Sequence, residues 1–216
     1  TRPGQENLNI TIVDGFCGGG RFSSAGNTVD GSPLAILHAV QRALQTLNHN
    51  RQKPVTISAE YHFVDSHPAA IDQLRSILVS EGFGSEIDNT ILLHTSEFVK
   101  VYPKIRQRIE ARTRRGVGRS IFFLDQKGYK RVPFEIIRDI LGSFTASEVL
   151  LTFATDFLLT HMTTDQPFLK AVAPIGLTPT TLKHWIEEKG QPGWRYLVQR
   201  GLKDHIQRAS GAPFIS

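Results

Sequence analysis

The stretch Ile10-Thr-Ile-Val-Asp14-Gly-Phe-Cys-Gly-Gly-Gly20 joins an alternating apolar segment, an acid and a glycine-rich turn. Its Ile and Val residues predict a β-strand that ends at Asp14. Four glycines follow the acid, namely Gly15, Gly18, Gly19 and Gly20. Glycine lets the backbone adopt positive φ and approach a ligand closely, and ligands of open α/β sheets bind at the carboxyl ends of strands. The stretch therefore predicts a ligand-binding turn, with a plain strand-turn as the alternative.

Two common phosphate-binding patterns do not fit this turn. A P-loop would need Lys and then Ser or Thr where Arg21 and Phe22 stand. A dinucleotide-binding turn would need a third glycine at Ser23, with a helix opening at once. The pattern Asp14-x-Phe16-x-Gly18-x-Gly20 instead resembles the first motif of S-adenosylmethionine-dependent methyltransferases, in the form seen in nucleic-acid enzymes.

Length and composition limit the classes of protein to which the chain can belong. The chain has 216 residues, of which 40% are hydrophobic, enough to bury one sizeable core. The single Cys17 excludes an internal disulfide and a zinc site built from several cysteines, which suits a reducing, cytoplasmic compartment. No signal peptide is visible, and no apolar run approaches the roughly 20 residues that span a bilayer. The net charge of +5 permits an acidic partner such as nucleic acid.

Strand and helix patterns alternate along most of the chain. Strands are expected over residues 10–14, 55–64, 90–94, 120–124 and 148–154, with helices between them. This rhythm predicts an α/β, Rossmann-like methyltransferase fold with a mainly parallel central sheet and helices on both faces. The polar residues 21–31 are expected to form a long loop, which would act as a lid or contact a partner.

Two regions are expected. Residues 1–156 would form the cofactor-binding core, and residues 157–216 a helical extension that leads into a truncated final strand. The extension contains two predicted helices, over residues 180–189 and 194–209.

Three strands are each expected to place an acid at the same sheet edge: Asp14, Asp65 and Asp125. That arrangement suits a cofactor that carries a nucleoside. An acid at the end of the second strand accepts hydrogen bonds from both ribose hydroxyls in nucleotide-binding folds. Asp65 and Ser66 could equally cap the helix that follows, and both interpretations stay open.

Three motifs in the same order resemble the three-Cys-motif partner (TcmP) family. They are Asp14-Gly-Phe-Cys-Gly-Gly-Gly20, Gly31-Ser-Pro-Leu34 and Phe122-Phe-Leu-Asp-Gln-Lys-Gly-Tyr-Lys-Arg-Val-Pro133, and the strand 149–153 is also similar. The likeness runs from about residue 9 to residue 156. The family is prokaryotic or viral, resembles class I methyltransferases in fold, and takes its name from the cysteines of a neighbouring partner protein.

The resemblance implies roles for several residues. The cofactor turn would contain Asp14, Phe16, Gly18, Gly19 and Gly20, with Asp65 as the ribose clamp and Ser66 beside it. The cofactor would be S-adenosylmethionine. The partners would be a nucleic acid and a three-Cys-motif protein, with no membrane involved.

Residues 125–129 stand where amino-methyltransferases carry an Asp-Pro-Pro-Tyr-like motif. In such enzymes an acid accepts a hydrogen bond from the exocyclic amine and an aromatic ring stacks on the extruded base. Asp125 and Tyr129 are therefore the candidate catalytic residues, although Gln126 and Lys127 depart from the motif. An ordinary strand-to-helix turn is the alternative. Asp125-x-Lys127 also weakly resembles metal-dependent nucleases, but no histidine spacing typical of a metal site is present.

The helix predicted from Phe98 onward carries many cations. The candidate nucleic-acid contacts are Arg112, Arg114, Arg115 and Lys127. A basic helix face can lie along phosphates. It can also be a solvated surface with cations favourably placed near a helix C-terminus. Three functions remain from the sequence: methyl transfer to nucleic acid, an inactive scaffold of the same fold, and more weakly a nuclease.

Overall fold

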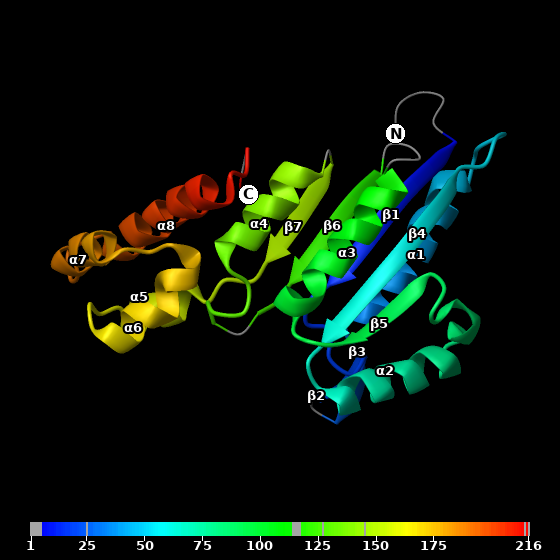
Figure 1. Ribbon diagram of the computed structural model, residues 1–216, viewed down its shortest axis with the longest axis horizontal. Coiled ribbons are helices and arrows are strands. Elements are labelled where there is room, and N and C mark those ends of the chain that lie inside the picture. Colours follow the sequence, from blue (N-terminus) through cyan, green and yellow to red (C-terminus); the bar gives the residue numbers. More distant parts are fainter. Residues whose placement is uncertain are drawn as a thin grey trace. The chain divides into compact units, whose positions relative to one another are not determined.

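The computed structural model describes residues 6–24, 26–113, 118–126, 128–144, 146–213 and 215 (Figure 1). Two compact units make up the chain. The first contains residues 1–124 and 144–150, and the second contains residues 125–143 and 151–216. The predicted core extended to residue 156, whereas here residues 125–143 and 151–156 group with the C-terminal helices.

The first unit carries the sheet. Its strands are β1 (Asn7–Asp14), β2 (Arg21–Ser24), β3 (Asn27–Asp30), β4 (Thr56–Asp65), β5 (Ile91–Thr95), β6 (Gly118–Leu124) and most of β7 (Ser147–Leu151). Its helices are α1 (Ser32–Asn48), α2 (Pro68–Ser80), the short η1 (Gly84–Glu86) and α3 (Phe98–Thr113).

The central sheet has five parallel strands in the order β5-β4-β1-β6-β7. β1 pairs on one side with β4, from Asn7↔Thr56 to Asp14↔Phe63, and on the other with β6. After β1, the chain adds β4 and then β5 on one side of it, and afterwards adds β6 and then β7 on the other side. The parallel sheet confirms the Rossmann-like fold predicted from the sequence. The switch point of the strand order lies between β1 and β6, where such folds bind ligands.

One face of the sheet is covered by α1 and α2. Leu34 and Leu37 of α1 and Leu74 of α2 join a buried cluster with Ile12 and Phe63 of the sheet. On β4, the cluster members Tyr61 and Phe63 lie at alternate positions, as the two-residue period of a β-strand requires.

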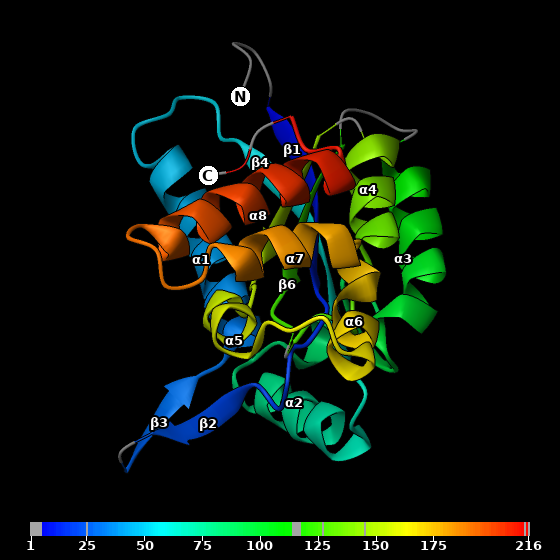
Figure 2. The same ribbon diagram turned by 90° about the vertical axis from the view of Figure 1, so that its left-hand side faces the viewer.

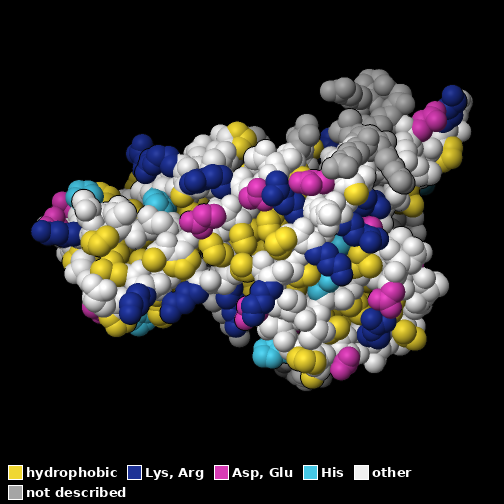
Figure 3. All heavy atoms as spheres, in the orientation of Figure 1, with side chains coloured by type: hydrophobic (Ala, Val, Ile, Leu, Met, Phe, Trp, Pro, Cys, Tyr) yellow, Lys and Arg dark blue, Asp and Glu magenta, His cyan; other side chains and the backbone are white. Residues whose placement is uncertain are grey.

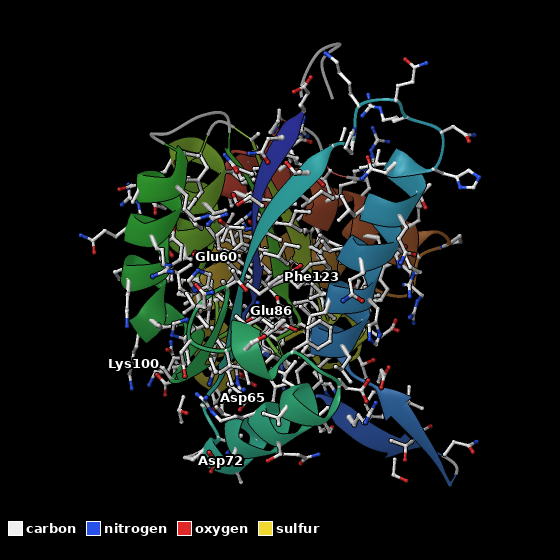
Figure 4. The ribbon with its side chains drawn as sticks, turned by 90° about the vertical axis from the view of Figure 1, so that its right-hand side faces the viewer. Glu60, Asp65, Asp72, Glu86, Lys100 and Phe123 are labelled. Atoms are coloured by element: carbon white, nitrogen blue, oxygen red, sulfur yellow. The ribbon has the colours of Figure 1, made fainter. Side chains whose placement is uncertain are left out.

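The opposite face of the sheet is covered by α3. Phe98 and Tyr102 of α3 pack edge-on or tilted around Phe122 of β6. Figures 2 and 4 show α1 and α3 on opposite sides of the sheet, and Figure 4 shows Glu60 on the α3 side and Phe123 on the α1 side. Both faces are therefore covered, which explains why β6 ends in the apolar run Ile121–Leu124.

The second unit is helical. It contains α4 (Phe134–Ser143), α5 (Thr155–His161), α6 (Gln166–Val172), the short η2 (Ala173–Ile175), α7 (Pro179–Glu187) and α8 (Trp194–Ser210). α4 and α8 are tied together by Arg138, whose Nε and Nη2 donate to the Ala209 carbonyl at 2.9 and 2.6 Å.

Several local predictions differ from the structure. The expected loop at residues 21–31 is an antiparallel hairpin of β2 and β3 instead. The helices α6 and η2 form within residues 166–175, where no helix was predicted from the sequence. The expected start of a final strand is not formed at Ala212 or Pro213.

We predict that Phe63→Ala lowers the free energy of unfolding by about 3–5 kcal/mol, because Phe63 is fully buried in the α1–α2 cluster. Urea denaturation measures this change. Val79→Ala is the control, since Val79 is 58% exposed and its truncation should cost about 0.5 kcal/mol or less. Equal losses in the two variants would contradict the assignment of the core.

Candidate functional site

The glycine-rich turn lies at the carboxyl end of β1 and is bonded to both neighbouring strands. The Gly15 amide donates to the Phe123 carbonyl of β6 at 2.9 Å. The Cys17 amide donates to the Val64 carbonyl of β4, also at 2.9 Å. The turn is therefore held across the sheet edge next to the switch point, where the sequence predicted a ligand-binding turn.

The structure brings Asp14 and Asp65 together at this turn. Asp14 is buried, and its Oδ1 accepts a hydrogen bond from the Phe16 amide at 3.1 Å. Asp65 is half-buried; its Oδ2 accepts from the Gly18 amide at 3.1 Å and its Oδ1 from the His67 amide at 2.8 Å. Asp65 thus connects the turn after β1 with the start of α2, beside which Figure 4 shows it.

Asp65 accepts from the amide of His67, the N-cap residue immediately before α2, and no described side chain caps the first turn of α2 itself. Ser66 is exposed beside it. An ionised carboxylate offers about four acceptor positions on its two oxygens, so two backbone donors leave acceptor capacity for a ligand. The hydrogen bonds to these two backbone amides and the binding of a ligand are therefore compatible at Asp65.

The turn glycines differ in what surrounds them. Gly18 has φ +59°, and a Cβ built there would meet nothing within 4 Å. Gly20 has φ +82°, and a Cβ there would lie 2.7 Å from Leu74 Cδ1. A Cβ on Gly19 would lie 2.9 Å from the Gln73 side chain. Gly20 and Gly19 thus allow the turn to approach α2 closely, while Gly18 borders open space.

The β2–β3 hairpin leaves directly from Gly20, and Figures 2 and 4 show it beside α2. Its base is closed by a hydrogen bond from the Gly31 amide to the Gly20 carbonyl at 2.7 Å. Arg21 bridges Asp30 at 2.9 Å and Glu81 at 2.7 Å, which connects the hairpin to the end of α2. These contacts hold the glycine-rich turn, the β2–β3 hairpin and α2 together on one side of the site.

Cys17 lies inside the turn and is buried. Burial and the nearby carboxylates of Asp14 and Asp65 raise the pKa of its thiol far above the ordinary value. The thiolate is the reactive form of cysteine, so Cys17 acts here as a small packing residue.

The predicted acceptor residues belong to the second unit, where Asp125 is exposed. The Gln126 Oε1 atom accepts from the backbone amides of Arg131 and Val132 at 3.2 and 3.0 Å. Gln126 therefore shapes the loop that leads to α4. Lys127 lies outside the described residues.

Tyr129 is almost fully buried, and burial raises the pKa of its hydroxyl to about 12. The hydroxyl donates to the Ala154 carbonyl at 2.7 Å, and the ring packs against Phe153 and Phe157. Tyr129 thus anchors the loop before α4. Stacking on an acceptor base, as predicted, would require this ring to leave its packed position.

A buried polar chain that the sequence motifs did not indicate lies on the α3 face of the sheet. Glu60 Oε1 is 3.1 Å from His62 Nε2, and His62 Nδ1 is 3.0 Å from His94 Nε2, with the two rings stacked. Glu60 also binds Arg108 at 2.9 Å and Arg112 at 3.5 Å. His62 and His94 are therefore hydrogen-bonded inside the fold, as expected for histidines in strands. Only the i, i+2 spacing of Glu60 and His62 on β4 could have suggested the contact.

The cations of α3 are largely bound within the protein. Arg112 also donates to the Ser58 carbonyl at 3.0 Å. Two further cations of α3 pair with acids of the same helix or just before it: Arg106 with Glu110 and Lys100 with Glu97. On the face in Figure 3 the described Lys and Arg side chains are spread among acidic ones. Arg112 is thus a partner of Glu60, while Arg114 and Arg115 lie outside the described residues.

Two shallow surface hollows lie away from the glycine turn. One is lined by residues 45–47 and 49–51 at the end of α1, and the other by Pro103, Arg106, Gln107 and Glu110 of α3. Each involves a single local segment, whereas binding sites usually gather groups from several elements. Among the described residues there is no cluster of His, Cys, Asp or Glu suited to a metal, and no helix long and apolar enough to span a bilayer. The turn held by Asp65 is therefore the candidate site.

We predict that Gly20→Ala is clearly more destabilising than Gly26→Ala. Both glycines have φ near +80°, so both variants suffer the cost of about 1–2 kcal/mol that a side chain brings in this conformation. Only Gly20 adds a clash, with Leu74 Cδ1 at 2.7 Å, because a Cβ at Gly26 meets nothing within 4 Å. Thermal unfolding of the two variants checks this, and equal losses would show that the close approach to α2 is not needed.

We predict that stability falls between pH 7 and pH 5 partly through His94. Burial, followed by His62, Lys104 and Arg108, lowers the pKa of His94 from 6.5 to about 4. The folded state therefore favours the neutral ring, so this stability is present above pH 6.5 and is lost as the pH falls toward 4. His94→Gln, whose amide can still donate to His62, should flatten the pH dependence in urea denaturation. An unchanged slope would contradict this role.

Comparison with protein-family models finds no match, and comparison with curated proteins finds none either. The resemblance to the three-Cys-motif partner family therefore depends on the motifs around Asp14, Gly31 and Asp125 alone. What the site itself offers is a backbone turn at a sheet edge, two carboxylates that hold it, and open space beside Gly18.

Proposed function

We propose that this chain is an S-adenosylmethionine-dependent methyltransferase domain whose acceptor is a nucleic acid. Support comes chiefly from one observation: the Gly18 amide donates to the carboxylate of Asp65, at the end of the neighbouring strand, at 3.1 Å. This contact puts a flexible glycine backbone and an acid side by side at the edge where Rossmann-like folds hold a nucleoside.

The residues of the turn fit such a cofactor. Open space beside Gly18 leaves room for a ligand against the backbone, as its empty Cβ position indicates. Asp65 would accept hydrogen bonds from the ribose hydroxyls with its remaining lone pairs. Asp14, buried and bonded to the Phe16 amide, would keep the turn in shape. S-adenosylmethionine, when bound, supplies a methyl group already activated by its sulfonium.

The protein would then mainly align the two reactants, because an activated donor needs orientation more than further activation. The exposed Asp125 would accept a hydrogen bond from the acceptor and orient it. The formal charge of +5 favours an anionic acceptor, as does the resemblance to the three-Cys-motif partner family. That resemblance also motivates a three-Cys-motif protein as partner and a prokaryotic, cytoplasmic setting.

A second candidate is a scaffold of the same fold that does not transfer methyl groups. It is favoured by the loop after β6, where Gln126 bonds to backbone amides and Tyr129 to the Ala154 carbonyl. In this conformation both side chains stabilise the loop and are not directed to a methyl acceptor. The two functions differ in a simple way, since a scaffold would show no transfer of a labelled methyl group to any nucleic acid.

We predict that calorimetry detects binding of S-adenosylmethionine and that Asp65→Ala weakens it at least tenfold, because each lost charged hydrogen bond is worth about 1.5–3 kcal/mol. Asp72→Ala is the matched control, since Asp72 is an exposed acid on α2 and should leave the Kd unchanged. Circular dichroism of both variants establishes that they are folded.

Absence of binding by the unaltered chain would rule out the cofactor. Equal affinity in the unaltered chain and Asp65→Ala would rule out the site. Binding without methyl transfer would favour the scaffold.

A further inference from the structure

α8 is the second of two consecutive helices in the C-terminal unit. α7 begins at a Thr178 cap, whose Oγ1 accepts from the Thr181 amide at 3.2 Å. It ends in a short turn in which Gly190 and Gly193 have φ of 96° and 80°, and α8 follows at once. Figure 2 shows α7 and α8 side by side. The connection, residues 188–193, is longer than the turn of about three to four residues in a helix-turn-helix motif, so the two helices form a helical hairpin whose second helix is α8.

One face of α8 is fixed by α7. The indole Nε1 of Trp194 donates to the Trp185 carbonyl, and Gly201 is so close to the Trp185 ring that a Cβ would lie 3.0 Å from it. Val198 and Leu202 on this face are buried. α8 is therefore held rigidly along one side, and its other side is presented outward.

The outward face of α8 carries four polar side chains at spacings of three, four and seven residues: Tyr196, Gln199, Arg200 and Lys203. Such spacings place residues on one helix face. Tyr196 is 69% exposed, and the other three are exposed as well. The exposed acid Asp204 lies on the same face, four residues after Arg200. Neither Arg200 nor Lys203 forms an ion pair with any residue in the described part of the chain.

This face contrasts with α3, the helix whose cations first suggested nucleic-acid binding. On α3, Arg108 and Arg112 are committed to Glu60, and Arg106 to Glu110. Releasing a paired arginine to a phosphate would leave its acid without a partner, most severely for the buried Glu60. On α8, Arg195 pairs with Asp156 at 3.0 Å, but Arg200 and Lys203 carry no such cost. The face with Arg200 and Lys203 is therefore the better surface for an anion.

We propose that the exposed face of α8 docks in the major groove of double-stranded DNA. Arg200 and Lys203 would donate to guanine O6 and N7, and Gln199 would pair with adenine N6 and N7, the base edges that these side chains read. Tyr196 would contact a backbone phosphate. The chain's pI of about 9.5 matches a polyanionic partner. This docking does not depend on the cofactor and extends the proposed function by naming how a duplex is held.

The test is selection of random 20-base-pair duplexes by the full chain, followed by fluorescence anisotropy on the enriched sequence. The double variant Arg200→Ala with Lys203→Ala should weaken binding at least tenfold, and Gln199→Ala should relax the preference for the selected sequence. The control is Lys170→Ala with Lys183→Ala, which removes the same charge from exposed positions on α6 and α7 and should change the Kd less than twofold.

Three outcomes would overturn the proposal: no enrichment of any duplex, equal losses in the double variant and the control, or tighter binding to single-stranded DNA or to RNA than to the duplex. Measuring Asp65→Ala in the same assay separates this surface from the cofactor site. That variant should keep its full affinity for the duplex even if S-adenosylmethionine is not the cofactor.

Discussion

Everything at the candidate site depends on one carboxylate. Asp65 accepts from the Gly18 amide on one side and the His67 amide on the other, so it connects the turn after β1 with the start of α2. An ionised acid that accepts backbone amides makes strong, directional hydrogen bonds, so Asp65 defines the course of the turn together with Asp14, which accepts from the Phe16 amide. The glycines then allow the turn to approach α2 closely, because a side chain at Gly20 would clash with Leu74.

The parts of the fold that follow from local patterns could be predicted from the sequence. Alternating Ile and Val residues before Asp14 and the apolar run ending at Leu124 both became parallel strands of the central sheet. The acid at the end of β4 was assigned either to a cap or to a ligand site, and it bonds to the amide of His67, the residue just before α2, rather than to an amide of the helix. These features depend on residues close in sequence, where periodicity and turn chemistry are informative.

The features that were missed depend on residues far apart. The chain from Glu60 through His62 to His94 needs two strands in register and a helix above them to supply Arg108. The sequence shows where cations occur but not which of them are paired with acids in the fold. The helices α3 and α8 therefore have similar basic sequences, although Arg108 and Arg112 of α3 are ion-paired and Arg200 of α8 forms no ion pair with a described residue. The hairpin of β2 and β3 was missed because its polar residues match a loop as well as a two-stranded ribbon. The ion pair of Arg21 with Glu81, which connects it to α2, joins residues far apart in the sequence.

The strand order also governs how the chain reaches this state. Asn9 of β1 pairs with Gly118 of β6, so one side of β1 stays open until a long intervening segment has been synthesised. Pairing of remote strands is slow, because loop-closure entropy is lost before the contacts compensate for it. A nascent chain that has not yet reached β6 therefore carries a half-built sheet in which β1 is an edge strand with unpaired backbone N–H and C=O groups. Translation pauses in that interval would favour aggregation or capture by chaperones.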